Sequence, residues 1–229
     1  MDSDYITIME IIFSFTYLIY ICIIVIFMSK NLKKVKKDEI KTAKYILLAF
    51  LSLMIGDLGH VGARLVTFFS ENFTLAYGIF GIGVLIEMIG LIFLFIFYTN
   101  AWRIHFNKPN NLIFKSLIGV GIIGLIIFTF PQNQWNTEPI SYEWLIFRNI
   151  PWLILGIVLA SLIIRDARAV KDPILIRIGI LILISFLFYM PVIFFGSIEP
   201  MLGMLMIPGT IIYMLWQYNS YKRFFKGNE

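Results

Sequence analysis

Residues 43–69 read AKYILLAFLSLMIGDLGHVGARLVTFF, an apolar run that also contains Asp57, His60 and Arg64. A helix needs about 20 apolar residues to cross roughly 30 Å of hydrocarbon, and this run is long enough. An ionised side chain inside a bilayer is costly, so such a group is expected to face protein or a water-filled cavity. The stretch therefore predicts a membrane-spanning helix with one polar face.

The whole chain shares this apolar character. Its 229 residues are 59% hydrophobic and 17% aromatic, and only 14% are charged, which is too little polar surface for a soluble globule. Apolar runs of spanning length lie near residues 5–28, 43–69, 77–100, 112–130, 144–164, 174–196 and 201–219. The connections between them are short, so residues 1–229 are predicted to form a single domain. The expected fold is an all-α integral membrane protein, a seven-transmembrane-helix bundle.

Positive charge indicates the orientation of this bundle. Nearly all of the 19 Lys and Arg lie on one side of the predicted seven-helix path, and the densest group is in SKNLKKVKKDEIKTAK, residues 29–44. Basic residues near helix ends stay cytoplasmic, so the N-terminus is expected outside and the C-terminus in the cytoplasm, most simply at the cell membrane. Residues 29–44 are also a candidate contact for anionic membrane lipids or a cytoplasmic partner, whereas no nucleic acid is expected.

Arg64 and Arg148 are the two basic residues predicted on the outer side. Glu10 falls at a similar depth in the first span, because a helix rises ~1.5 Å per residue. The first two spans are antiparallel neighbours, so Glu10 and Arg64 are a candidate ion pair. Two interpretations stay open: the pair fixes helix packing only, or it belongs to a binding site.

Asp57, His60 and Arg64 share one face of their helix, since residues three and four apart lie above one another. Glu87 is expected near the same depth in the next span. An ionised group turned to lipid there would cost at least roughly 2.5 kcal/mol, so these polar faces are expected to point inward. The four side chains are therefore predicted to line one cavity that opens to the outside.

Small residues form a second stripe on the same helix, at Ser52, Gly56, Gly59 and Ala63, and Gly83 and Gly90 flank Glu87 on the next. Small residues let two helices approach closely in a membrane. We therefore expect another helix to approach the second span closely along this stripe, and Glu87 to face protein rather than lipid.

The later spans contribute a different feature, which is proline. Pro151, Pro191 and Pro208 each fall within a predicted span, where the missing N–H and the ring clash kink or loosen a helix. Such kinks open volume between helices. The polar and aromatic residues nearby are candidates for the opposite wall of the cavity: Asn149, Trp152, Tyr189, Thr210 and Tyr213.

Three function classes fit these residues. The first is a small-molecule-binding protein, receptor or sensor-like, with an outward-opening pocket between the second, third, fifth and seventh spans; its ligand site would be Glu10, Asp57, His60, Arg64, Glu87, Arg148, Asn149, Trp152, Tyr189 and Tyr213. The second is a proton-coupled transporter that loads Asp57 or Glu87. The third is an intramembrane enzyme acting on a lipid, with Asp57, His60 and Glu87 as general acid and base. A metal held by these three residues is a weak alternative, because one His gives little specificity.

Several seven-helix classes are excluded, and no cofactor is predicted. A retinal protein needs a Lys in its last span, and MLGMLMIPGTIIYMLWQYN at residues 201–219 has none. The Asn-Pro-x-x-Tyr motif of class A receptors is absent. The chain has two His in total, too few for a multi-histidine metal hydrolase.

Overall fold

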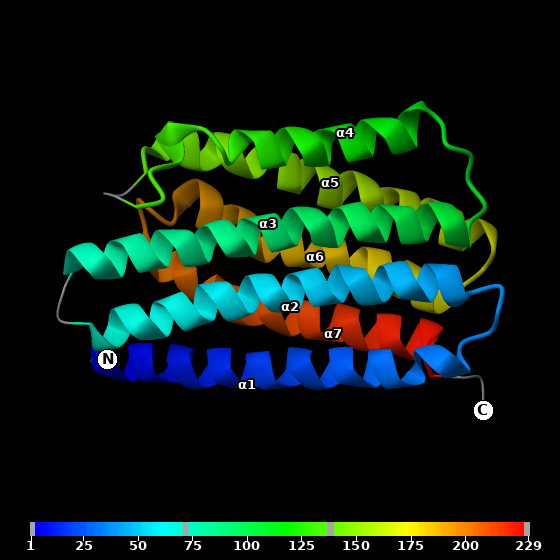
Figure 1. Ribbon diagram of the computed structural model, residues 1–229, viewed down its shortest axis with the longest axis horizontal. Coiled ribbons are helices and arrows are strands. Elements are labelled where there is room, and N and C mark those ends of the chain that lie inside the picture. Colours follow the sequence, from blue (N-terminus) through cyan, green and yellow to red (C-terminus); the bar gives the residue numbers. More distant parts are fainter. Residues whose placement is uncertain (1–2, 71–72, 137–139, 227–229) are drawn as a thin grey trace.

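The computed structural model describes residues 3–70, 73–136 and 140–226, and almost all of them are helical. Seven α-helices run roughly along one axis, and α1 begins at the end of the bundle opposite to where α7 ends (Figure 1). No strand occurs within these ranges. The all-α class is confirmed, and the helices are α1 (Ser3–Asn31), α2 (Ile40–Phe69), α3 (Phe73–His105), α4 (Leu112–Ile127), α5 (Tyr142–Ala169), α6 (Pro173–Phe195) and α7 (Met206–Phe224).

Six of these helices are long and apolar enough to cross a membrane, which is the architecture of a multi-pass integral membrane protein. The exception is α4, whose 16 residues span about 24 Å at 1.5 Å each, short of a hydrocarbon core of about 30 Å. The predicted span 112–130 ends early because Pro131 forces the preceding Phe130 into an extended conformation, with ψ 138°. A short 3₁₀-helix, η2 (Pro131–Asn133), follows.

The last span begins at Met201, as the sequence predicts, but it is not α-helical from its start. A 3₁₀-helix, η3 (Pro200–Leu205), occupies the first part of the predicted span 201–219, and α7 begins only at Met206. Pro208 therefore lies in the first turn of α7, where its missing N–H needs no intrahelical partner. Pro208 nevertheless lies within the candidate span Met201–Phe224, as predicted, and Pro151 and Pro191 lie inside α5 and α6. The kinks expected at these prolines stay predictions.

Helices α2 and α3 lie side by side along most of their length (Figure 1). A Cβ added at Gly90 would lie 2.6 Å from the backbone oxygen of Ser52 and 3.0 Å from the Cα of Gly56. One added at Gly83 would lie 2.9 Å from the backbone oxygen of Gly59. The two backbones are thus too close for larger side chains, and the predicted small-residue interface is confirmed.

Five buried rings fill the centre of the bundle: Phe50, Phe95, Tyr98, Phe186 and Trp216. We call them the aromatic layer. Trp216 joins its members, because its ring centroid lies 5.5 Å from that of Phe50, 5.9 Å from that of Phe95 and 5.2 Å from that of Tyr98. Phe50, Phe95 and Trp216 have no exposed surface. The layer therefore closes the middle of the bundle.

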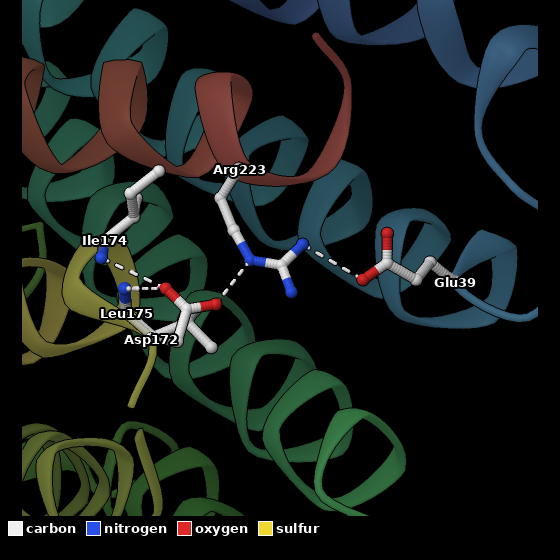
Figure 2. Close-up of polar contacts among 5 residues, drawn as sticks. All are labelled: Glu39, Asp172, Ile174, Leu175 and Arg223. Atoms are coloured by element: carbon white, nitrogen blue, oxygen red, sulfur yellow. Dashed lines mark hydrogen bonds and ion pairs between the residues drawn. The ribbon is translucent and has the colours of Figure 1, made fainter. Parts of the chain in front are cut away.

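Arg223 ties three helices together at one end of the bundle (Figure 2). Its Nε donates to Asp172 Oδ2 at 2.6 Å, and a terminal nitrogen donates to Glu39 Oε1 at 2.9 Å. Asp172 also caps α6, since its Oδ1 accepts from the backbone N–H groups of Ile174 and Leu175 at 3.0 Å each. We call Glu39, Asp172 and Arg223 the Arg223 cluster.

The charge of Asp172 is favoured by these contacts. Burial by itself would raise the pKa of this carboxyl group, but the hydrogen bonds from Arg223 and from the backbone N–H of Leu175 outweigh it. The pKa of Asp172 is accordingly lowered from its ordinary value. The ion pair with Arg223 is therefore maintained at neutral pH.

A second ionic contact lies at the same end. Asp166 of α5 is 5% exposed, accepts from Trp102 Nε1 at 2.9 Å and pairs with Lys108 Nζ at 3.0 Å. Lys108 is in the connection between α3 and α4, and the Arg223 cluster contacts the start of α2 and the connection between α5 and α6. The basic connections are thus gathered at one end of the bundle, which we call the basic end.

Candidate functional site

A cavity of about 370 Å³ lies between α1, α2, α3, α5, α6 and α7. Ligand pockets in proteins are typically about 300–1,000 Å³, so its size suits a small molecule. Its lining on α2, α3, α6 and α7 lies at least three residues, or nearly one turn, farther from the basic end than the aromatic layer, as with Leu53 against Phe50 and Tyr213 against Trp216. The cavity is therefore separated from the basic end by buried rings.

The structure brings nine of the ten predicted ligand-site residues to this cavity: Asp57, His60, Arg64, Glu87, Arg148, Asn149, Trp152, Tyr189 and Tyr213. Arg64 is exposed, whereas Asp57 and Arg148 are buried. The tenth, Glu10, belongs to α1, but its side chain lies outside the described part of the chain. Its ion pair with Arg64 stays a prediction, as does the binding role of the whole set.

Asp57 is held by a residue that the sequence analysis did not select. Tyr17 of α1 donates its hydroxyl hydrogen to Asp57 Oδ2 at 2.5 Å, and the two side chains are 8% exposed each. Tyr17 sits in an apolar run among other aromatic residues, so nothing in its local sequence marks it as a polar partner. Only the register between α1 and α2 places it opposite Asp57.

His60 and Glu87 form a second contact on the same side of the cavity. His60 Nδ1 lies 3.0 Å from Glu87 Oε2, and their side chains are 21% and 29% exposed. The contact is an ion pair by distance, but it lacks hydrogen-bond alignment, because Nδ1 has no hydrogen-bond partner among the described residues. Asp57 and Glu87 together give α2 and α3 an acceptor-rich surface, which we call the acidic wall.

The metal alternative is not supported by this geometry. Asp57 pairs with Tyr17 of α1, while His60 pairs with Glu87. Across the described ranges, no group of three His, Cys, Asp or Glu side chains is arranged to hold a metal ion. The weak alternative that Asp57, His60 and Glu87 hold one metal ion therefore gains no support from this arrangement and stays a prediction.

The opposite side of the cavity presents hydrogen-bond donors. Arg148 and Trp152 of α5 and Tyr213 of α7 are 7%, 4% and 4% exposed. In the described part of the chain, Arg148 Nε, Trp152 Nε1 and the Tyr213 hydroxyl have no hydrogen-bond partner. We call these three residues the donor wall. A buried polar group without a partner costs roughly 1–3 kcal/mol, so three at one cavity need a physical explanation.

Arg148 is held in place by an aromatic ring. Its guanidinium carbon lies 4.6 Å from the centroid of the Trp135 ring, a cation–π contact. Trp135 is itself fixed, because its Nε1 donates to the backbone oxygen of Phe128 at 2.9 Å. Nothing in the local sequence associates Trp135 with Arg148, because Trp135 lies in the connection between α4 and α5 and Arg148 lies within α5.

Two other predicted residues use their polar groups within the protein. Asn149 donates from Nδ2 to the backbone oxygen of Leu145 at 2.8 Å, inside α5. The hydroxyl groups of Tyr189 and Thr210 lie 3.3 Å apart across α6 and α7. These residues shape the cavity, but they offer a ligand less than the donor wall does.

The carboxylates of the cavity thus lie on α2 and α3, beside His60 and Arg64 of α2, and the donor wall lies on α5 and α7. Comparison of the chain with protein family models, with curated proteins and with solved structures finds no match. Any function therefore has to be argued from the cavity itself.

Proposed function

We propose that the protein is a small-molecule-binding multi-pass membrane protein, receptor- or sensor-like, whose ligand occupies the cavity between the acidic wall and the donor wall. The observation that carries this proposal is the donor wall, whose three residues line a cavity of ligand size and carry buried donors without a protein partner in the described part of the chain. A purely packing role would be met at lower cost by apolar side chains. A ligand that accepts hydrogen bonds from these donors would recover the free energy that is lost when they are buried without a partner.

The proposal includes an orientation in the cell membrane. All seven helices cross, the short α4 with local thinning of the bilayer around it. The N-terminus is outside, and the basic end is cytoplasmic. In support, residues 29–44 and the other basic connections gather at one end, as the distribution of positive charge in membrane proteins requires. The ligand then enters from outside, and anionic lipid headgroups lie against residues 29–44.

A route for a signal supports the receptor-like reading. The ring centroid of Tyr213 lies 5.5 Å from the ring centroid of Tyr189 and 5.4 Å from that of Trp216. A ligand at the Tyr213 hydroxyl would therefore act on the aromatic layer, and α7 continues from there to Arg223 in the Arg223 cluster. Buried rings and ion pairs close this path to passage of the ligand, which favours a receptor over a carrier.

A binding screen with a blocked cavity tests the proposal. Purified protein in lipid nanodiscs is screened by thermal unfolding against small polar compounds, and any compound that stabilises it is tested on two variants. Val84→Phe adds bulk inside the cavity, whereas Val158→Phe makes the same change at a position of α5 that is 38% exposed and away from the cavity. We expect Val158→Phe to keep the stabilisation and Val84→Phe to lose it.

Two outcomes would contradict this reading. If no compound stabilises the protein, or if both variants respond equally, the cavity is not a small-molecule site. Uptake of the stabilising compound into sealed proteoliposomes would assign the site to a carrier instead.

A further inference from the structure

We infer that the ligand is a small zwitterion, with a protonated amine at the acidic wall and a carboxylate or phosphate at the donor wall. The inference rests on the proposed function and specifies the chemical class of the ligand. It is carried by the division of charge within one cavity.

The donor wall selects an anionic group. Guanidinium and indole nitrogens only donate hydrogen bonds, and the Tyr213 hydroxyl can donate as well. Oxyanions accept several hydrogen bonds at once, and bonds between charged groups are about twice as strong as neutral ones. Three donors, one of them on a buried guanidinium held over Trp135, therefore fit one oxyanion.

The acidic wall selects a cation. The Tyr17 hydroxyl donates to Asp57 Oδ2, and His60 Nδ1 lies 3.0 Å from Glu87 Oε2. When ionised, which a bound cation favours, a carboxylate accepts up to about four hydrogen bonds, so both groups can accept from a cation in the cavity. A protonated amine has three donors and a compact positive charge, which matches two carboxylates on neighbouring helices.

The two walls do not neutralise each other directly. Among the described residues, no ion pair joins Arg148 to Asp57 or Glu87, although all three line the same cavity. Opposite charges that share a cavity without touching are best joined by a molecule that carries both complementary charges. A ligand with only one charge would leave one wall unsatisfied.

The cavity also limits the size of this zwitterion. Its volume of about 370 Å³ corresponds to roughly a dozen water molecules at about 30 Å³ each. The rings of Tyr17, Trp152, Tyr189 and Tyr213 line it, so the chain between the two charges meets aromatic surface. The ligand is therefore a compact molecule with an apolar connection between an amine and an oxyanion.

Matched truncated compounds test the inference on the full-length protein in nanodiscs. The probes are the ω-amino acids from glycine to 6-aminohexanoate, each compared with the alkylamine and the carboxylate of the same chain length, and phosphoethanolamine. Calorimetric titration measures the affinities. We expect one zwitterion to bind at least about tenfold more tightly than both of its truncated analogues, a difference of about 1.4 kcal/mol.

Two variants then assign the ends of the ligand. Asp57→Asn should lower the affinity for the zwitterion to that of the carboxylate analogue, without weakening the carboxylate analogue itself. Arg148→Gln should lower the affinity for the zwitterion to that of the alkylamine analogue, without weakening the binding of the alkylamine itself. Asp38→Asn and Arg168→Gln make the same chemical changes at exposed positions and should have no effect. The comparison of analogues on the unmodified protein stands even where a variant does not fold.

The outcomes separate the inference from the proposed function. A singly charged or uncharged compound that binds as tightly as any zwitterion and is blocked by Val84→Phe would overturn the inference and keep the binding function. Absence of binding by every compound would overturn both. Competition by phosphatidylethanolamine in the nanodisc would support the inference with a lipid headgroup as the source of the zwitterion, whereas binding that is independent of this lipid would support a soluble one.

Discussion

Replacement of Gly90 by Ala should destabilise the protein, because it pushes α3 away from α2. The new Cβ would lie 2.6 Å from the Ser52 backbone oxygen and 3.0 Å from the Gly56 Cα. Both neighbours are backbone atoms, so the helices themselves must move, and overpacking of this kind costs about 1–3 kcal/mol. Ala is favoured over Gly in a helix by about 1 kcal/mol, which offsets part of this. Because the clash is with backbone atoms, we take the overpacking cost at the upper end of its range, about 2–3 kcal/mol. The expected net loss is then about 1–2 kcal/mol, or about 2–8 °C in the unfolding midpoint for a chain of this length.

A matched substitution in α2 isolates the packing contribution. A Cβ added at Gly62 meets nothing within 4 Å, so Gly62→Ala should gain the helix preference and lose nothing. Thermal unfolding of both variants in the same nanodiscs measures the difference. If Gly90→Ala is as stable as Gly62→Ala, the close contact of α2 and α3 does not exist, and the position of Glu87 in the acidic wall is no longer supported.

Three further predictions concern the acidic wall, the basic end and the orientation. Tyr17→Phe strands the buried Asp57 carboxylate and should cost about 1–3 kcal/mol in thermal unfolding, whereas Asp57→Asn keeps an acceptor for Tyr17 and should cost less; the opposite order would contradict the pair. The pKa of Asp172 is lower in the folded protein than in the unfolded chain, where it is about 3.9, so ionised Asp172 stabilises the folded state. This contribution to the free energy of unfolding is fully present above the unfolded-state pKa and is lost as pH falls through the folded-state pKa. Asp172→Asn keeps an acceptor for the α6 cap and should reduce this pH dependence of unfolding, and an unchanged profile would contradict the account. A cysteine at Glu143 should react with an impermeant thiol reagent added outside and one at Lys36 should not, while reversed labelling would overturn the orientation.

The fold class followed from the sequence because apolar runs of spanning length leave few alternatives in a membrane. The helix boundaries were predicted less accurately next to proline residues. Pro131 ends α4 early through its effect on Phe130, and the residues before Met206 form a 3₁₀-helix instead of the first turns of α7. Each deviation depends on local backbone geometry that hydropathy does not report.

The candidate site was predictable only in part, for a related reason. Asp57, His60 and Arg64 stand out because ionisable residues are rare in a span, and helical periodicity places them on one face. Tyr17 and Trp135 do not stand out, since an aromatic residue in an apolar run usually packs or anchors the helix. Their contacts depend on how helices align with one another, and periodicity within one helix does not determine that alignment.

An experimental density map of the full-length protein with its best-binding zwitterion would test the central claim most directly. The account predicts compact density in the cavity, with its amine end at Asp57 and Glu87 and its oxyanion end at Arg148, Trp152 and Tyr213. Density in the reverse orientation, or a cavity filled by protein side chains with the compound bound elsewhere, would contradict it.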